Sequence, residues 1–262
     1  MLTQEAPARE VRNIEYWRAG GRALQMDAYI PDGPGPFPAA VIVHGGGWVA
    51  GDRRWNVEPL FQPLLEAAVA CFSISYRFAT EPSLFGVAID DVAEAIRYVR
   101  AHALEFKVDP ARIALVGESA GGQLASMAAL RKPGSSVKAV VALYSPADLE
   151  QLAQSARAFP APFRLAMQGM PWAGLFRTRL QELSPLRHVR SGMPPFLLIH
   201  GTADTLVPFE QSENMCRAVR TAGAVCDLIA VKGGGHGLRW WESAGLTSYK
   251  NLMTGWLRTR LV

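Results

Sequence analysis

Cysteine is scarce in this sequence, and its scarcity limits the chemistry that the protein can carry. The 262 residues include only three cysteines, Cys71, Cys216 and Cys226, and these lack the spacing of metal ligands. Cys71 and Cys226 fall in predicted strands and Cys216 in a predicted helix. An odd number of cysteines cannot all pair in disulfides, although the count allows a single disulfide between two of them. We expect no metal site, and no other motif indicates a cofactor.

Charged residues are also few. They make up 19% of the chain against 49% for hydrophobic residues, a balance that argues against disorder and provides ample material for a core. Lys and Arg outnumber Asp and Glu by 27 to 23, and the arginines are scattered along the chain. We therefore expect no nucleic-acid or membrane partner. The length permits one large α/β domain or two small ones.

Long apolar runs are absent as well. No run approaches the length of a membrane span. Residues 1–10 lack the apolar region of a signal peptide. The sequence as written predicts a cytoplasmic protein, whereas a secreted protein whose leader had been removed would look the same. The oligomeric state stays open.

The stretch 116–122, Val-Gly-Glu-Ser-Ala-Gly-Gly, carries the strongest functional signal. It joins a predicted strand at 112–116 to a predicted helix at 123–130, and Gly-x-Ser-x-Gly in that context is the pattern of a nucleophile elbow. The tight turn requires small residues two positions on either side of Ser119. The amide of Ala120 then lies at a helix N-terminus, where it can stabilise a developing oxyanion.

The rest of the chain alternates strands with helices. An edge hairpin is predicted at 11–17 and 23–30, further strands at 38–44, 69–76, 137–144, 195–200 and 225–231, and helices at 57–68, 86–103, 208–222 and 243–258. Pro59 and Pro63 are expected to limit the first helix to short turns. This order predicts a single α/β domain: a mostly parallel, doubly wound sheet of about eight strands with helices on both faces.

Residues from about 147 to 190 interrupt this alternation. They are rich in aromatic, methionine and proline residues, including Phe159, Phe163, Met170, Trp172 and Phe176. The segment is too long for a simple crossover loop, so we interpret it as a small helical cap. An ordinary surface excursion is the alternative. A cap should fold its apolar side over Ser119, and Met170 and Trp172 are then expected to bind substrate.

An activated serine needs a base, and the base needs an orienting acid. Elbow folds place them in the chain order Ser, Asp or Glu, His. Of the five histidines, only His236 lies in a glycine-rich loop after the last predicted strand, so we expect it to be the base. Asp204, after the preceding strand, is the expected acid and Asp148 its rival. Glu118 should point away from the serine.

The sequence 44–48, His-Gly-Gly-Gly-Trp, follows another predicted strand. Its glycines leave bare amides that can face a substrate, so Gly46 and Gly47 are expected to complete an oxyanion hole with Ala120. Trp48 either forms a wall of the substrate pocket or packs in the interior.

Together these residues resemble the carboxylesterases of the α/β-hydrolase superfamily over residues 12–260. Residues 44–48 and 117–122 are shared with the hormone-sensitive-lipase-like family, but that family's Asp-Pro-Leu acid motif is absent. Residues 200–212 and 234–237 look more like the bifunctional feruloyl and acetyl-xylan esterase-like group. They also resemble the acid loop of prolyl-oligopeptidase-type peptidases. The resemblance implies that Ser119 is the nucleophile, His236 the base and Asp204 the acid.

The function that this resemblance implies is serine carboxylesterase activity on acetyl to butyryl or aryl-acid esters. The partner would be a small-molecule ester or an acylated oligosaccharide, such as acetylated or feruloylated plant polysaccharide. Kynurenine formamidases share an HGGxW motif and the chain size, so a formamidase-like amidase is the alternative. A peptidase is a less favoured alternative, because this chain has no room for the propeller domain that such catalytic domains normally carry. A binding module on this fold would have lost a catalytic residue, whereas Ser119, Asp204 and His236 are all present.

Overall fold

The computed structural model describes residues 8–54, 56–80, 84–131, 136–154 and 173–262. Within them, one eight-stranded sheet has the order β1-β2-β4-β3-β5-β6-β7-β8. The hairpin β1–β2 forms one edge, β2 is antiparallel to β1 and β4, and the remaining neighbours are parallel. The strands are β1 (Ala8–Ala19), β2 (Arg22–Pro31), β3 (Phe37–Val43), β4 (Ala70–Ile74), β5 (Val108–Glu118), β6 (Ala139–Leu143), β7 (Phe196–Gly201) and β8 (Cys226–Val231). The predicted mostly parallel α/β fold is confirmed.

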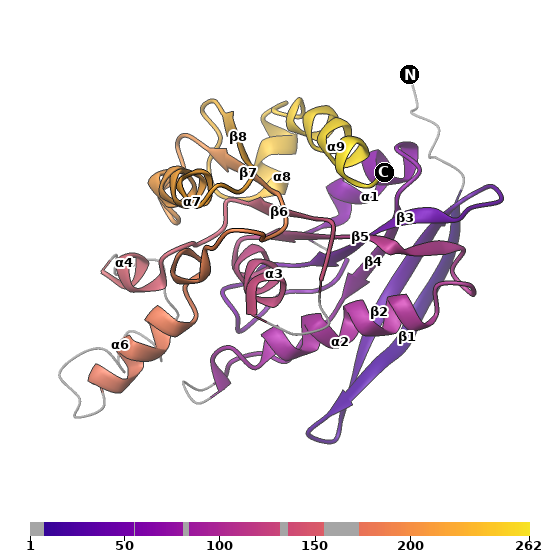
Figure 1. The fold of residues 1–262 in the computed structure, drawn as a ribbon, viewed down its shortest axis with the longest axis horizontal. Coiled ribbons are helices and arrows are strands. Elements are labelled where there is room, and N and C mark those ends of the chain that lie inside the picture. Colours follow the sequence, from indigo (N-terminus) through magenta and orange to yellow (C-terminus); the bar gives the residue numbers. More distant parts are fainter. Residues whose placement is uncertain (1–7, 55, 81–83, 132–135, 155–172) are drawn as a thin grey trace.

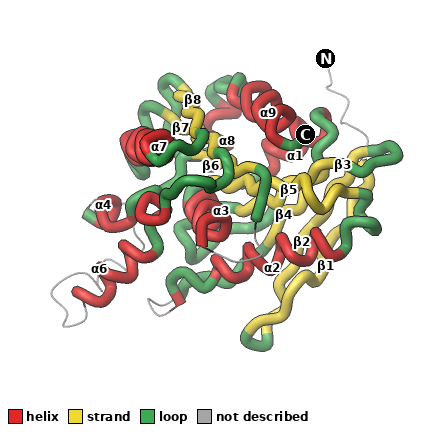
Figure 2. Tube along the Cα trace, viewed as in Figure 1, coloured by secondary structure: helices red, strands yellow, loops and turns green. Residues whose placement is uncertain are grey.

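Helices cover both faces of the sheet (Figure 1), and the tube view shows the same three layers by element type (Figure 2). α2 (Ala88–Ala101), α3 (Ala120–Arg131) and α7 (Glu210–Thr221) pack on one face, and α1 (Glu58–Glu66), α8 (Leu238–Ser243) and α9 (Tyr249–Arg260) on the other. Along β3, Val41 joins the first core and Ile42 the second, because successive side chains of a strand point to opposite faces. Strands buried on both faces are therefore continuously apolar.

Two helix predictions were wrong. Helix α1 is continuous from Glu58 to Glu66, although it contains Pro63. Its other proline lies in the first turn, where the amides have no helical acceptor, and buried Leu60 and Leu64 hold the helix on the sheet. The predicted closing helix 243–258 begins later than expected, as α9 at Tyr249, and the short helix α8 before it was not predicted. Gly245, with φ +70°, follows the end of α8 and separates the two helices.

The segment 147–190 is helical where the structure describes it. It contains α4 (Leu149–Ala153), α6 (Ala173–Glu182) and the short 3-10 helix η2 (Pro185–His188). Phe176 of α6 is buried and its ring lies 6.2 Å from that of Phe85. Phe159, Phe163, Met170 and Trp172 lie outside the described residues. Whether the segment caps Ser119 therefore stays a prediction.

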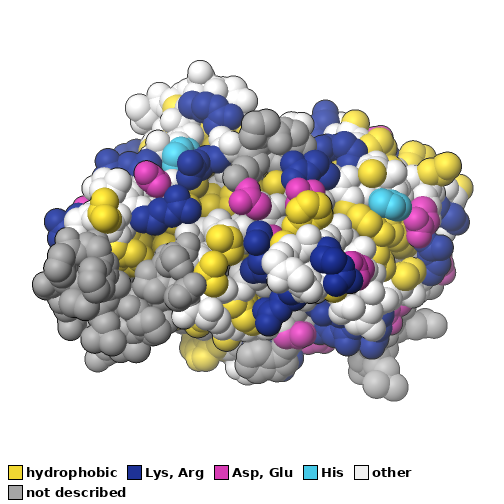
Figure 3. Space-filling model, turned by 90° about the horizontal axis from the view of Figure 1, so that it is seen from below, with side chains coloured by type: hydrophobic (Ala, Val, Ile, Leu, Met, Phe, Trp, Pro, Cys, Tyr) yellow, Lys and Arg dark blue, Asp and Glu magenta, His cyan; other side chains and the backbone are white. Residues whose placement is uncertain are grey.

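The surface and the cysteines complete the description. Figure 3 shows Lys and Arg side chains spread over one face among Asp and Glu, which matches the scatter of arginine along the sequence. All three cysteines are free thiols, so the disulfide that the sequence left open is not formed. In the described ranges, no helix is both long and apolar enough to cross a membrane. The same residues hold no cluster of three or more His, Cys, Asp or Glu suited to a metal.

Candidate active site

Ser119 lies in the turn between β5 and α3, with a φ of +52°, in the left-handed region that side-chain-bearing residues rarely adopt. The glycines around it permit close backbone approach. A Cβ atom on Gly117 would lie 2.4 Å from the carbonyl oxygen of Gly121, and one on Gly121 would lie 2.2 Å from that of Val43. The small residues expected two positions from the serine are therefore required on both sides.

The structure brings Ser119, His236 and Asp204 together. The Ser119 Oγ lies 2.9 Å from Nε2 of His236, and His236 Nδ1 lies 2.7 Å from Oδ2 of Asp204. A carboxylate only accepts hydrogen bonds, so Nδ1 carries the proton that it donates to Asp204. In the neutral ring, Nε2 then presents a lone pair to the serine hydroxyl. The arrangement can remove the proton from Ser119 and return it to a leaving group.

Three loops at the carboxyl ends of parallel strands supply these residues, in the region where open α/β sheets bind ligands. The loops after β7 and β8 are joined backbone to backbone. The Ala203 amide donates to the carbonyl of Gly234 at 2.9 Å, and a Cβ on Gly201 would lie 2.2 Å from that same oxygen. These contacts fix the spacing between Asp204 and His236 without help from either side chain.

The carboxylate of Asp204 receives donors on both oxygens. Oδ1 accepts from the amides of Leu206 and Val207 at 2.9 Å each, and Oδ2 lies 3.3 Å from Nε2 of His200 in addition to its bond with His236. Burial opposes the charge, but bonds from His200, His236 and Val207 lower the pKa of Asp204 below its usual range. Asp204 is therefore ionised at neutral pH.

His200 is the residue of this group that the sequence analysis did not single out. Its only signal was its place at the end of a strand, four residues before Asp204. The rival acid Asp148 lies elsewhere: its Oδ1 accepts from the amide of Gln151 at 3.0 Å and caps α4.

A cavity of about 430 Å³ opens beside Ser119. Its walls include Gly46, Gly47, His236, Leu206 and Leu238. Among the described residues, the amides of Gly46, Gly47 and Ala120 donate to no backbone carbonyl. Gly46 and Gly47 line the cavity beside Ser119 and Ala120 follows the serine in sequence, so their role as oxyanion donors stays a prediction that this geometry allows.

The carboxylate of Glu118 accepts a hydrogen bond from the amide of Gly45 and also interacts with Tyr144 and Asn56. Burial raises the pKa of Glu118, and these donors oppose that shift only in part. The Glu118 carboxylate is bonded to the loop 44–48, but the residue lines the same cavity as Ser119, so the structure does not bear out the expectation that it points away from the serine.

Trp48 packs in the interior and is not among the described residues that line this cavity. Its side chain is 4% exposed, its Nε1 donates to Gln123 at 2.9 Å, and its ring lies edge-on to Phe85 at 5.1 Å. Gln123 in turn donates to the carbonyl of Leu183, the residue after α6, at 2.7 Å. Of the two roles left open for Trp48, packing is observed among the described residues, and a role at the substrate pocket stays a prediction. Met170 and Trp172, the other expected substrate contacts, lie outside the described residues.

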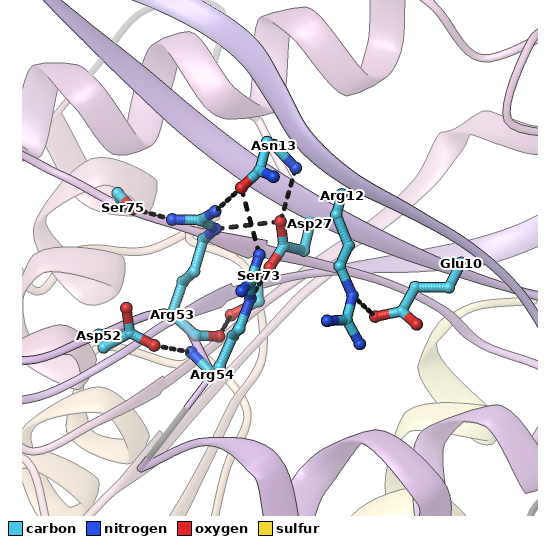
Figure 4. A network of polar contacts seen from close by, with 9 residues as sticks. All are labelled: Glu10, Arg12, Asn13, Asp27, Asp52, Arg53, Arg54, Ser73 and Ser75. Carbon is cyan, nitrogen blue, oxygen red and sulfur yellow. Dashed lines mark hydrogen bonds and ion pairs between the residues drawn. The ribbon is translucent and has the colours of Figure 1, made fainter.

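The segment that follows residues 44–48 ends in Arg53 and Arg54, and both belong to the polar network of Figure 4. Fully buried Asp27 of β2 pairs with Arg53 at 3.1 Å, and with Arg54, and accepts from the amide of Asn13 at 2.8 Å. Arg53 also donates to the side chains of Asn13 at 2.6 Å and Ser75 at 3.1 Å. Burial opposes the charge of Asp27, but Arg54, the Asn13 amide and Arg53 lower its pKa below the usual range. The edge hairpin therefore holds the loop that carries Gly46 and Gly47.

The sheet order, the strained serine after β5 and the Ser119–His236–Asp204 geometry define an α/β-hydrolase. The chain matches the family model described as BD-FAE over residues 26–219. It therefore belongs to the BD-FAE family.

Curated relatives agree with this class. The chain is 32% identical over 216 residues to the probable carboxylic ester hydrolase LipM of Mycobacterium tuberculosis, a match that covers 76% of this chain and 49% of that protein. It is 28% identical over 230 residues to a probable isoprenylcysteine alpha-carbonyl methylesterase, ICMEL1, of Arabidopsis thaliana, covering 81% and 48%. The chain spans about half the length of these curated relatives.

Solved structures match over nearly the whole chain. A truncated form of a carbohydrate esterase from gut microbiota has a TM-score of 0.82 at 26% identity, covering 99% of this chain and 98% of that one. The native Est2 esterase of Thermogutta terrifontis has a TM-score of 0.71 at 25% identity, covering 96% and 93%.

Proposed function

We propose that this protein is a serine carboxylesterase that hydrolyses small esters through an acyl-enzyme intermediate. The observation that carries the proposal is the unbroken contact series from Ser119 through His236 to Asp204 beside an open cavity. The esterase relatives support the reaction class.

In the proposed reaction, the Ser119 Oγ attacks the ester carbonyl carbon while His236 Nε2 takes the hydroxyl proton. The carbonyl oxygen becomes an oxyanion, which the amides of Gly46, Gly47 and Ala120 stabilise. Collapse of this intermediate breaks the bond to the alkoxy group, which leaves as the alcohol with the proton from His236. Water then attacks the acyl-serine by the same steps, releasing the acid and restoring the Ser119 hydroxyl.

The finer substrate assignment is also proposed. The cavity volume suits a short acyl or a compact aryl group, and the similarity to a carbohydrate esterase supports an acylated sugar as the alcohol part. We retain the segment 147–190 as a cap of the same domain. Its described helix α6 is linked to the glycine loop through Gln123 and Phe85.

The test is Ser119→Ala, assayed on p-nitrophenyl acetate with Ser126→Ala as the matched control. Ser126 is a buried serine of α3 whose hydroxyl donates to its own helix at 2.7 Å. We expect a loss of about 10⁶-fold in kcat for Ser119→Ala, the scale of nucleophile loss in a serine hydrolase, and near-normal activity for the control. More than a few per cent residual activity in a clean Ser119→Ala preparation would remove this serine from its role.

A second assay addresses the alternative reaction. Acetyl, butyryl, octanoyl and feruloyl esters are compared with N-formylkynurenine at equal enzyme concentration. A kcat/KM for the formamide above that of every ester would replace the esterase proposal with the amidase.

A further inference from the structure

Two imidazole rings meet the same carboxylate oxygen of Asp204. His236 Nδ1 lies 2.7 Å from Oδ2, and His200 Nε2 lies 3.3 Å from it. His200 is fully buried at the end of β7, so this second contact is made away from solvent. The mechanism proposed above uses His236 and assigns nothing to His200.

The partners of His200 determine which of its nitrogens carries the proton. Nε2 faces two acceptors, Oδ2 of Asp204 and the carbonyl of Val207 at 2.9 Å, so Nε2 must be the donor. Nδ1 lies 2.7 Å from the hydroxyl of Ser212 in α7, which can donate to it. A neutral ring protonated at Nε2 satisfies all three contacts.

We propose that His200 is a positioning residue of the Ser119–His236–Asp204 site, and that its Nε2–H shares the Asp204 Oδ2 with His236. The inference rests on the proposed function. By taking part of the negative charge of Oδ2, His200 weakens the hold of Asp204 on the His236 imidazolium. His236 then returns its proton to the leaving group more readily.

The other charged and titratable groups around Asp204 and His236 also influence the pH dependence of activity. Asp204 accepts from the Leu206 and Val207 amides on its other oxygen, and these bonds do not depend on His200. Glu118 at the end of β5 interacts with His236 electrostatically. The Tyr144 ring lies 4.8 Å from that of His236, and Arg239 of α8 lines the same cavity. None of these groups changes when only His200 is replaced.

The experiment compares His200→Asn with His200→Gln in the pH dependence of kcat/KM for p-nitrophenyl acetate. The amide of Asn takes the place of Nδ1 and keeps Ser212 as a partner, but it loses the donor to Asp204. The amide of Gln reaches the place of Nε2 and keeps that donor.

In His200→Asn, Oδ2 of Asp204 no longer shares its negative charge with the Nε2–H of His200. The full charge should favour the protonated form of His236. The midpoint of the acid limb should therefore rise by about half a pH unit, the scale of one weak hydrogen bond. His200→Gln should stay within about 0.1 unit of the wild type. A role confined to stability would lower the folded fraction in both variants and leave the midpoint in place, and that result would overturn the proposal.

A measurement on the wild type covers the case in which His200→Asn does not fold. In protein with ¹⁵N-labelled imidazoles, the nitrogen shifts of His200 should show a protonated Nε2 and an unprotonated Nδ1. The opposite tautomer would refute the inference. Ser119→Ala separates the two proposals: if that variant stays active, the esterase mechanism fails, whereas an inactive Ser119→Ala with an unmoved midpoint in His200→Asn rejects the role of His200 alone.

Discussion

The carboxylate of Glu118 accepts a hydrogen bond from the amide of Gly45, across 73 positions of sequence. This bond joins the residue before the candidate nucleophile to the residue before the two candidate oxyanion glycines. A Cβ atom on Gly45 would lie 2.6 Å from the Glu118 Oε1, so only glycine fits there without displacing the carboxylate. The positions of Gly46 and Gly47 relative to Ser119 therefore depend on this contact.

Replacing Glu118 should separate its two roles as acceptor and charge. In Glu118→Ala the Gly45 amide loses its acceptor, and we expect kcat/KM to fall by about 10- to 100-fold, the scale of a hydrogen bond to a charged group. Glu118→Gln keeps an acceptor oxygen and should retain most of the activity. Steady-state kinetics of both variants check this. Equal losses in the two would show that the charge, and not the bond to Gly45, is what matters.

The two candidate acids give a second matched pair. Asp204→Asn should lower kcat by about 10⁴-fold, because an amide no longer holds His236 in the tautomer that presents Nε2 to the serine. Asp148→Asn should leave activity and stability nearly unchanged, since asparagine caps a helix about as well as aspartate. Activity and thermal melting of both variants are the measurements. The reverse order of activity losses would overturn the choice of acid.

Much of this site could be predicted because short-range pattern determines it. The elbow glycines and the loop 44–48 each carry their reason in local backbone geometry, and the chain order of Ser119, Asp204 and His236 follows strand topology. The role of His200 could not be predicted in this way. Its contact with Asp204 depends on how the loop after β7 folds back, and many histidines end strands without such a partner.

The two wrong helix predictions have tertiary causes. Pro63 removes one helical hydrogen bond, but burial of Leu60 and Leu64 outweighs that cost. The closing helix was predicted to begin at Ser243 but begins at Tyr249, because α8 ends at Ser243 and Gly245 then adopts a positive φ, which the sequence permits but does not require. The role of Trp48 could not be predicted either, because an aromatic residue beside the glycines of 44–48 suits a pocket wall as well as a core.

Close approach at the elbow makes a further prediction about stability. Gly121→Ala would place its Cβ 2.2 Å from the Val43 carbonyl, so backbone must move, at a cost of about 3 kcal/mol. Gly255 lies within α9 with nothing within 4 Å of its would-be Cβ. Gly255→Ala should therefore stabilise the protein by about 0.5–1 kcal/mol. Urea unfolding of both variants checks the opposite signs. A neutral Gly121→Ala would mean that the elbow is looser than its contacts indicate.

The last prediction concerns the length of the acyl chain. The cavity of about 430 Å³ has apolar walls at Leu206 and Leu238, and the segment 147–190 brings Met170 and Trp172, whose places are not described. Each buried methylene contributes roughly 0.8 kcal/mol, so a pocket with free space favours longer acyl groups. Once the space is filled, overpacking costs about 1–3 kcal/mol and outweighs that gain. We expect kcat/KM to peak between acetyl and butyryl esters and to fall steeply by octanoyl.

A p-nitrophenyl ester series on the wild type, Met170→Ala and Trp172→Ala measures this preference. Trp17→Ala is the control, because Trp17 is a partly exposed residue of the edge strand β1. If the segment lines the acyl site, one or both of its variants should move the optimum to longer chains, since a truncated side chain frees space for added methylenes. The control should keep the wild-type profile. Activity that climbs through octanoyl and decanoyl in the wild type would refute the short pocket. An unmoved optimum in both segment variants would show that residues 147–190 do not bound the acyl group.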